Sequence, residues 1–154
     1  MRYLITGGGT GGHIYPALAI CKGLLAADKE AEVLYVGTRA GLEAELVPRE
    51  CIPFAIIDAA GIMGKSPGKA IMGAARATRG LLQAAAIVRR HRPQVVLGTG
   101  GYVSGPVVFM ASMLGVRCAI QEQNAVPGFT NRMLSRVVSE VFTPFRGTEQ
   151  HFPR

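Results

Sequence analysis

The chain has 154 residues, enough for one domain with a sizeable hydrophobic core. Apolar residues make up 49% of it and charged residues 18%, a composition that excludes an intrinsically disordered chain. The formal net charge of +7 favours anionic partners. No apolar run approaches the roughly 18 residues of a membrane span, and the three cysteines form no CxxC pair. We therefore predict a protein of the reducing cytoplasm without a transmembrane segment, a disulfide framework or a zinc site.

Short apolar runs alternate with longer helical patterns along the chain. The predicted strands cover residues 3–6, 32–37, 54–58, 94–98, 116–121 and 140–143. The predicted helices cover residues 13–27, 40–48, 68–91, 105–114 and 128–136. Such alternation favours an α/β fold, a Rossmann-like doubly wound parallel sheet with helices on both faces. No repeat or linker interrupts the pattern, so we predict one domain over residues 1–154.

A glycine-rich loop, GGGTGGH at 7–13, follows the first predicted strand, and its glycines satisfy the G-x-G-x-x-G pattern. A site for NAD would need an acidic residue at the end of the second strand, where this chain has Gly-Thr-Arg at 37–39. Arg39 would suit NADP only, and a Walker A loop is excluded because no Lys-Ser or Lys-Thr follows the glycines. Backbone amides that bind a diphosphate or a sugar remain the favoured interpretation, against a tight turn that binds nothing.

Two further segments follow strands and precede helices, GTGGYVSGP at 98–106 and EQNAVPG at 122–128. In a doubly wound sheet, ligands bind beyond the carboxyl ends of the strands, at the point where the strand order reverses. We therefore expect both segments to lie beside the loop at 7–13, in one crevice.

Several side chains in this crevice are suited to chemistry. His13 and Glu122 are candidate general bases, although a histidine at a helix start can also simply pack or cap there. Asn124 can donate and accept hydrogen bonds, which suits a sugar, but asparagine is also common in turns. Tyr102 and Ser104 are candidate substrate contacts, and Ser104 is equally a candidate cap for the following helix.

The positive charge is concentrated in one stretch, because no acidic residue occurs between Asp58 and Glu122. On the predicted helix at 68–91, helical periodicity predicts a basic face and an apolar core face. The basic face contains Lys69, Arg76, Arg79 and Arg90, and the core face Ile71, Ala75, Leu82 and Ala85.

The loop before this helix carries Ile62, Met63 and Lys65. Apolar side chains beside cations suit an anionic membrane surface. Nucleic acid is disfavoured because residues 59–92 contain no aromatic side chain for base stacking. A solvated basic face without a partner is the remaining alternative.

Four segments together resemble the N-terminal half of the MurG family of N-acetylglucosaminyltransferases. They are GGTGGHIYPALA, GTRAGLEAELVP, VVLGTGGYVSGP and EQNAVPGFTNR. The resemblance implies one domain of an inverting GT-B transferase at the cytoplasmic face of the bacterial plasma membrane, attached peripherally. It implies UDP-N-acetylglucosamine as the donor, lipid I as the acceptor, lipid II as the product for peptidoglycan synthesis, and no essential metal or other cofactor.

The resemblance also implies roles for individual residues. Donor contacts would come from Thr10, Gly11, Gly12 and Asn124. Contacts to the acceptor diphosphate would come from Gly100, Gly101, Tyr102 and Ser104. His13 or Glu122 would be the base. The membrane-facing residues would be Ile62, Met63, Lys65, Lys69, Arg76 and Arg79.

A second domain supplies most donor contacts in the MurG family, and these 154 residues hold no counterpart of it. We therefore expect little transferase activity from this chain alone. The alternative is a non-catalytic module that binds a lipid diphosphate or a nucleotide, or one subunit of a split glycosyltransferase.

Overall fold

The structure is a computed structural model that describes residues 1–59 and 67–152, with the backbone alone over 67–74. Six strands form one parallel sheet in the order β3-β2-β1-β4-β5-β6. They are β1 (Arg2–Thr6), β2 (Glu32–Gly37), β3 (Phe54–Ile56), β4 (Val95–Gly98), β5 (Arg117–Gln121) and β6 (Glu140–Phe142). This is the strand order of the doubly wound nucleotide-binding fold, and it reverses between β1 and β4.

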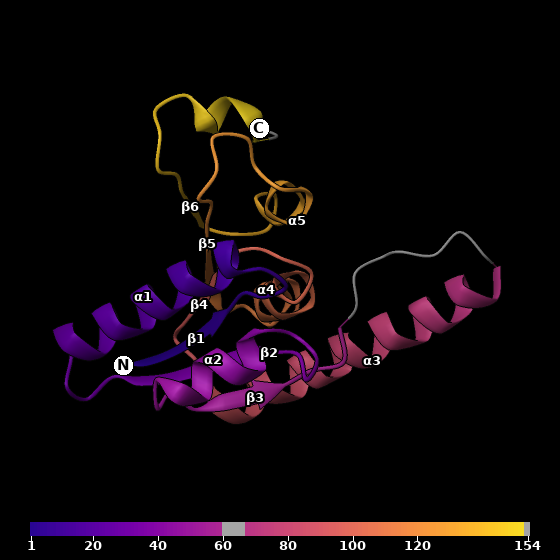
Figure 1. Cartoon of the computed structure of the whole chain (residues 1–154), viewed down its shortest axis with the longest axis horizontal. Helices are drawn as coiled ribbons and strands as arrows, with labels where there is room; N and C mark the ends of the chain where they lie inside the picture. The colour runs from indigo at the N-terminus through magenta and orange to yellow at the C-terminus, as the bar shows by residue number, and fades with distance from the viewer. Residues whose placement is uncertain (60–66, 153–154) are drawn as a thin grey trace.

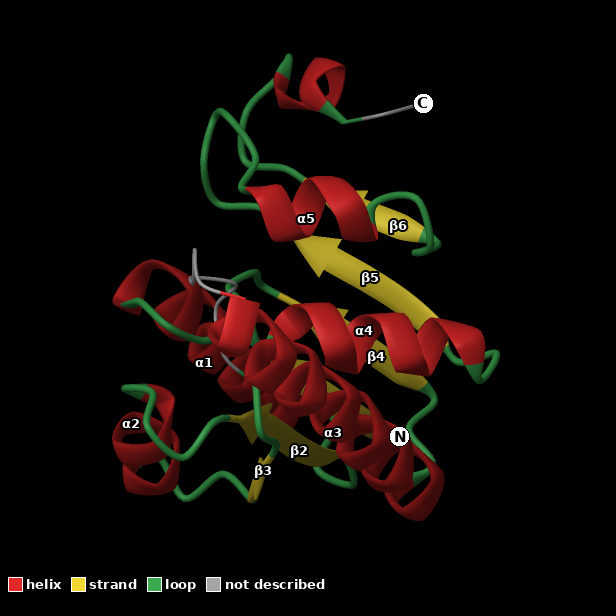
Figure 2. Cartoon of the chain, turned by 90° about the vertical axis from the view of Figure 1, so that its right-hand side faces the viewer, coloured by secondary structure: helices red, strands yellow, loops and turns green. Residues whose placement is uncertain are grey.

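Among the described residues, five α-helices cover the two faces of the sheet (Figure 1). They are α1 (Gly11–Ala27), α2 (Glu43–Arg49), α3 (Pro67–His91), α4 (Ser104–Met113) and α5 (Phe129–Leu134). Side chains of α1 and α2 pack on one face of the sheet, and those of α3, α4 and α5 pack on the other. Figure 2 shows α3, α4 and α5 in front of the strands.

The predicted fold class is therefore confirmed, and every predicted strand and helix is present within about three residues of its expected ends. A short 3₁₀ helix at Thr148–His151 was not predicted. The two cores follow from the alternation of side chains along a strand. Leu4 is buried among the helices on one face, and Ile5 is buried against α1 on the other.

The rotation of α3 differs from the prediction. Leu82 was expected in the core but is 67% exposed, and Ala75 is also exposed, whereas Ala85 is buried as predicted and the side chain of Ile71 lies outside the described residues. Instead Gly80, Ala84 and Val88 face inward. A Cβ atom at Gly80 would lie 2.5 Å from the Asp58 carbonyl oxygen, so the helix approaches the end of β3 closely at this glycine. Close approach at a small residue sets the rotation of the helix and turns Leu82 outward.

Candidate functional site

The two glycine loops meet at the reversal of strand order between β1 and β4. The Gly8 amide donates a hydrogen bond to the Gly100 carbonyl oxygen at 3.4 Å. Gly101 has φ +79°, and a Cβ atom there would overlap the Gly8 carbonyl oxygen. Glycine is thus required at position 101 by both its backbone conformation and the contact between the loops.

Residues of all three predicted loop segments surround His13. Its Nδ1 lies 3.0 Å from the Thr99 carbonyl oxygen, and the Gln123 side-chain amide contacts the same nitrogen. A Cβ atom at Gly100, where φ is +104°, would lie 2.8 Å from Nδ1. The expectation that the loops after β1, β4 and β5 lie side by side is therefore confirmed.

The hydrogen bond to Thr99 favours one tautomer of a neutral His13. A carbonyl oxygen can only accept, so the hydrogen bond to Thr99 requires the proton on Nδ1 and leaves the lone pair on Nε2. The carbonyl oxygen of the Gln123 side chain is buried without a hydrogen-bond partner. Rotating this amide by half a turn would direct that oxygen at the Nδ1 proton, which Thr99 and Gln123 would then share. Nε2 is then the basic atom of the crevice.

The other candidate base, Glu122, is fully buried and accepts five hydrogen bonds. Oε1 accepts from the backbone amides of Gln123 and Asn124, at 3.0 and 2.9 Å, and from the Asn124 side chain at 2.8 Å. Oε2 accepts from the Gly128 amide at 3.1 Å and from the Asn131 side chain at 2.9 Å. Glu122 therefore holds the loop between β5 and α5 together.

Burial alone would raise the pKa of the Glu122 carboxyl, but the donated hydrogen bonds outweigh it and lower the pKa below its ordinary value. A carboxylate with a lowered pKa and with its lone pairs already occupied is a weak proton acceptor. Asn124, in contrast, is exposed, and its side-chain nitrogen is the donor to Glu122. Its amide oxygen remains available to a ligand.

Ser104 lies in the protein interior. Its side chain is fully buried, so its hydroxyl is not exposed at the crevice where the sequence predicts a substrate contact. It also does not cap α4, because it is the first residue of that helix and no side chain makes the capping hydrogen bond there. Its hydroxyl donates to the carbonyl oxygens of Gly100, at 2.7 Å, and Thr6, at 3.1 Å. Ser104 thus ties the second glycine loop to β1.

Glu43 is a buried carboxylate that the sequence did not predict, and it binds the backbone of the first glycine loop. It accepts hydrogen bonds from the Gly9 amide at 3.3 Å and from the Thr38 amide and hydroxyl at 3.0 and 2.8 Å. The Thr38 hydroxyl also lies 3.2 Å from the Tyr102 hydroxyl. Burial of Glu43 could not be predicted from the sequence. It lies in the first turn of α2, where an acidic residue is usually exposed.

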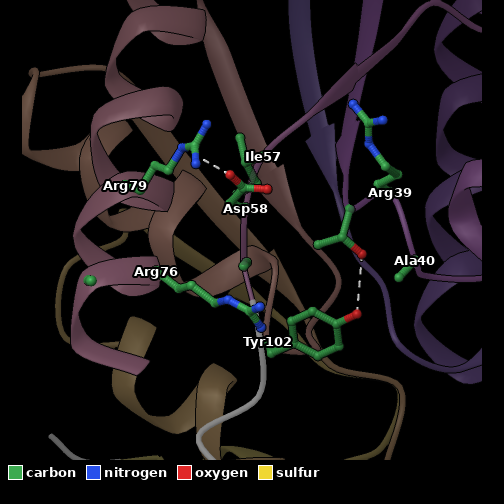
Figure 3. Close-up of a pocket in the computed structure, with 10 residues that line it drawn as sticks. Arg39, Ala40, Ile57, Asp58, Arg76, Arg79 and Tyr102 are labelled. Atoms are coloured by element: carbon green, nitrogen blue, oxygen red, sulfur yellow. Dashed lines mark hydrogen bonds and ion pairs between the residues drawn. The ribbon is translucent and has the colours of Figure 1, made fainter. Parts of the chain in front are cut away.

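A cavity of about 490 Å³ opens beside Tyr102, between the ends of β2 and β3 and the middle of α3 (Figure 3). Arg79 pairs with Asp58 at 3.0 Å on one side of it. The lining residues are Thr38, Arg39, Ala40, Ile57, Asp58, Ala59, Ala75, Arg76, Arg79 and Tyr102. Three arginines and one acidic residue make the cavity positively charged.

The other predicted donor-contact residues lie at the start of α1, and the described residues predicted to face the membrane lie on α3. Thr10 precedes α1, and Gly11 and Gly12 form its first turn, where backbone amides lack partners within the helix. Arg76 is exposed, as predicted. The backbone of Lys69 lies in α3. Its side chain, and the whole of Ile62, Met63 and Lys65, lie outside the described residues.

Over residues 1–59 and 67–152, no group of three or more His, Cys, Asp or Glu side chains is arranged to hold a metal ion. Within the same ranges, no helix is both long enough and apolar enough to span a membrane.

The chain is similar to bacterial proteins named UDP-N-acetylglucosamine–N-acetylmuramyl-(pentapeptide) pyrophosphoryl-undecaprenol N-acetylglucosamine transferase. The relative from Symbiobacterium thermophilum is 53% identical over 153 residues, and the relative from Desulforudis audaxviator is 54% identical over 154 residues. Each match covers 99% of this chain and 41% of the relative. The chain thus spans about two fifths of the length of these proteins.

Structural comparison agrees with the sequence comparison. The crystal structure of MurG from Acinetobacter baumannii superposes with a TM-score of 0.84 at 34% identity, covering 99% of this chain and 43% of that one. The expected resemblance to the N-terminal half of the MurG family is confirmed. The family model of the glycosyltransferase family 28 N-terminal domain matches residues 3–143, and the chain therefore belongs to that family.

Proposed function

We propose that this chain is the acceptor-binding half of an inverting glycosyltransferase. The enzyme would transfer N-acetylglucosamine from UDP-N-acetylglucosamine to the C4 hydroxyl of the muramyl sugar of lipid I, giving lipid II. The observation that carries the proposal is the identity of 53–54%, over 99% of the chain, to transferases whose name states this donor and acceptor. The crevice formed by the two glycine loops supports it, since such loops bind phosphates through backbone amides.

In this proposal His13 is the general base. The C4 oxygen attacks the anomeric carbon of the donor from the face opposite to UDP, and its proton passes to Nε2 of His13. A glycosidic C–O bond forms, the bond from the anomeric carbon to the diphosphate oxygen breaks, and UDP leaves with the electron pair. Glu122 holds the loop that carries Asn124, which we assign to the donor sugar.

The diphosphate of the acceptor would lie against the second glycine loop, at Gly100, Gly101 and Tyr102. The donor would contact Thr10, Gly11 and Gly12 at the start of α1, where the free backbone amides and the helix dipole favour negative charge. The chemistry assigned to these residues uses no metal ion.

We also propose that the enzyme works at the cytoplasmic face of the plasma membrane, because its acceptor is lipid-linked. Ile62, Met63, Lys65, Lys69 and Arg76 are the residues assigned to the membrane surface. Arg79 contributes less than predicted, because its charge is paired with Asp58.

The alternative is a module that binds a lipid diphosphate or a nucleotide without turnover, or a subunit whose donor half is a separate chain. Without the region that the relatives add, neither the leaving group nor a closed cleft would be organised.

One reconstitution separates the two functions. The chain is mixed with a separately produced C-terminal segment of the Symbiobacterium thermophilum relative, and transfer of labelled N-acetylglucosamine to a lipid-linked muramyl-pentapeptide acceptor is measured. We expect transfer only when both pieces are present. Acceptor binding without transfer, while the intact relative is active in the same assay, would favour the non-catalytic module.

A further inference from the structure

We propose that the cavity beside Tyr102 binds carboxylate groups of the peptide carried by the acceptor, with Arg39 and Arg76 as the anion-binding side chains. The inference rests on the proposed function, because it concerns another part of the same acceptor. The roles argued above place no ligand inside this cavity, although two of its lining residues already have a role: Tyr102 at the acceptor diphosphate and Arg76 at the membrane surface.

The charges that line the cavity are unbalanced. Asp58 is its one acidic lining residue, and that carboxylate is engaged by Arg79 at 3.0 Å. Arg39 and Arg76 form no ion pair among the described residues. No acidic residue occurs from 59 to 121 to supply a partner. Two free guanidinium groups at one cavity of about 490 Å³ favour a ligand with carboxylate groups, which arginine binds through paired hydrogen bonds.

The position of the cavity connects it to the glycine loops. Tyr102 lines the cavity and belongs to the second loop, and its ring lies against the first loop, 3.1 Å from where a Cβ atom of Gly9 would be. Its hydroxyl and that of Thr38 are 3.2 Å apart at the cavity wall. Figure 3 shows the Arg76 side chain directed toward the Tyr102 ring. A ligand with its diphosphate at the glycine loops can therefore extend past Tyr102 into the cavity.

The acceptor named for the relatives combines the required parts in one molecule. It carries a diphosphate, an N-acetylmuramyl sugar and a pentapeptide, and a peptide ends in a carboxylate. A cavity of this volume accommodates a few residues of such a peptide. Ile57, Ala59 and Ala75 provide apolar wall for aliphatic side chains. A phospholipid headgroup is the rival anion for the cavity. Such a headgroup could equally bind Arg89 and Arg90 of α3, which are exposed and lie outside the cavity.

The test uses the 154-residue chain and two soluble probes, N-acetylmuramyl-pentapeptide diphosphate and the same diphosphate without the peptide. Dissociation constants are measured by calorimetry, and binding to vesicles of 30% anionic phospholipid is measured separately. We expect the peptide-bearing probe to bind at least about fivefold more tightly than the peptide-free probe.

The variants are Arg39→Gln and Arg76→Gln, with Arg90→Gln as the matched control. Arg90 is an exposed arginine of α3 that does not line the cavity. We expect each of the first two variants to weaken binding of the peptide-bearing probe by about threefold to tenfold. The dissociation constant of the peptide-free probe should stay within about twofold of the unmodified value. The control should leave both probes unchanged, and Arg39→Gln should leave vesicle binding unchanged.

The outcomes distinguish this inference from the proposed function. Equal affinity for the two probes would overturn the peptide site while leaving acceptor binding at the glycine loops intact. Loss of vesicle binding in Arg39→Gln, with unchanged probe affinities, would assign the cavity to a lipid headgroup. If neither probe binds to the unmodified chain, the proposed acceptor half is itself wrong, and the peptide site is rejected with it.

Discussion

Single residues at the crevice differ in which of their atoms remain free for chemistry. His13 comes after β1, and Glu122 comes after β5 of the same sheet. Gln123 links them, because its backbone amide donates to Glu122 and its side chain contacts His13. The Thr99 carbonyl oxygen accepts a hydrogen bond from Nδ1 of His13, and Nε2 keeps its lone pair. The oxygens of Glu122 accept five hydrogen bonds from its own loop and from α5. The first arrangement suits proton transfer, and the second suits holding a loop.

The two residues should respond differently to substitution in the reconstituted enzyme. His13→Ala should lower kcat by roughly 10²- to 10⁴-fold without lowering the thermal stability, because a general base is lost and its ring is only partly buried. The basic limb of the pH–rate profile should lose its ionisation. Turnover above a tenth of the unmodified rate would exclude His13 as the base.

Glu122 should control stability in acid. Its pKa is lowered in the folded chain, so its contribution is complete above the ordinary glutamate pKa of 4.5 and is lost as the pH falls through the lowered folded value. Glu122→Gln should cost about 2 kcal/mol or more of unfolding free energy at pH 7, because buried donors lose their charged acceptor. Urea unfolding between pH 7 and 3 should show a flatter pH dependence for the variant. An identical slope would refute the role.

At the scale of elements, the two glycine loops use glycine for different reasons. Gly101 lies where the loops touch, with positive φ and no space for a side chain. Gly11 lies in the first turn of α1, where a Cβ atom would meet the Tyr15 ring at 3.1 Å. Because Tyr15 is 61% exposed, its ring can move aside. One glycine is therefore structural, and we propose that the other leaves space for a ligand.

A pair of substitutions tests this distinction. Gly101→Ala should destabilise the fold by more than about 2 kcal/mol, since it combines strain with overlap of the Gly8 carbonyl. Gly11→Val should leave thermal unfolding largely unchanged but abolish binding of the muramyl diphosphate or of UDP-N-acetylglucosamine in the reconstituted enzyme. Binding within threefold of the unmodified chain would show that no ligand approaches Gly11.

For the whole molecule, the net charge of +7 is concentrated between Asp58 and Glu122, and we propose that this stretch meets an anionic membrane surface. Electrostatic attraction and insertion of apolar side chains are both needed, because neither alone usually anchors a protein stably. The exposed basic residues of α3 extend the charge beyond the cavity beside Tyr102.

Vesicle sedimentation should show binding to anionic lipid that weakens as salt rises, because charges are screened beyond roughly 8–10 Å at physiological ionic strength. Replacing Lys65, Lys69 and Arg76 with glutamate should abolish it, and Ile62→Ser with Met63→Ser should weaken it at every salt concentration. The matched control reverses Arg132, Arg136 and Arg146, which are exposed elsewhere. An equal loss in the control would mean that total charge, and no particular surface, drives binding.

The sequence alone determined the fold class, the succession of strands and helices, and the loops that form the crevice. These depend on local patterns: apolar runs of strand length, helical periodicity, and glycine where the chain turns. The roles of Ser104 and Glu122, the buried carboxylate of Glu43 and the rotation of α3 were decided only by the tertiary structure. Each depends on hydrogen bonds or packing between residues far apart or in adjoining loops, such as Ser104 with Thr6 and Gly80 with Asp58. Local patterns predict where a side chain occurs in an element, but its partners depend on how the elements pack together.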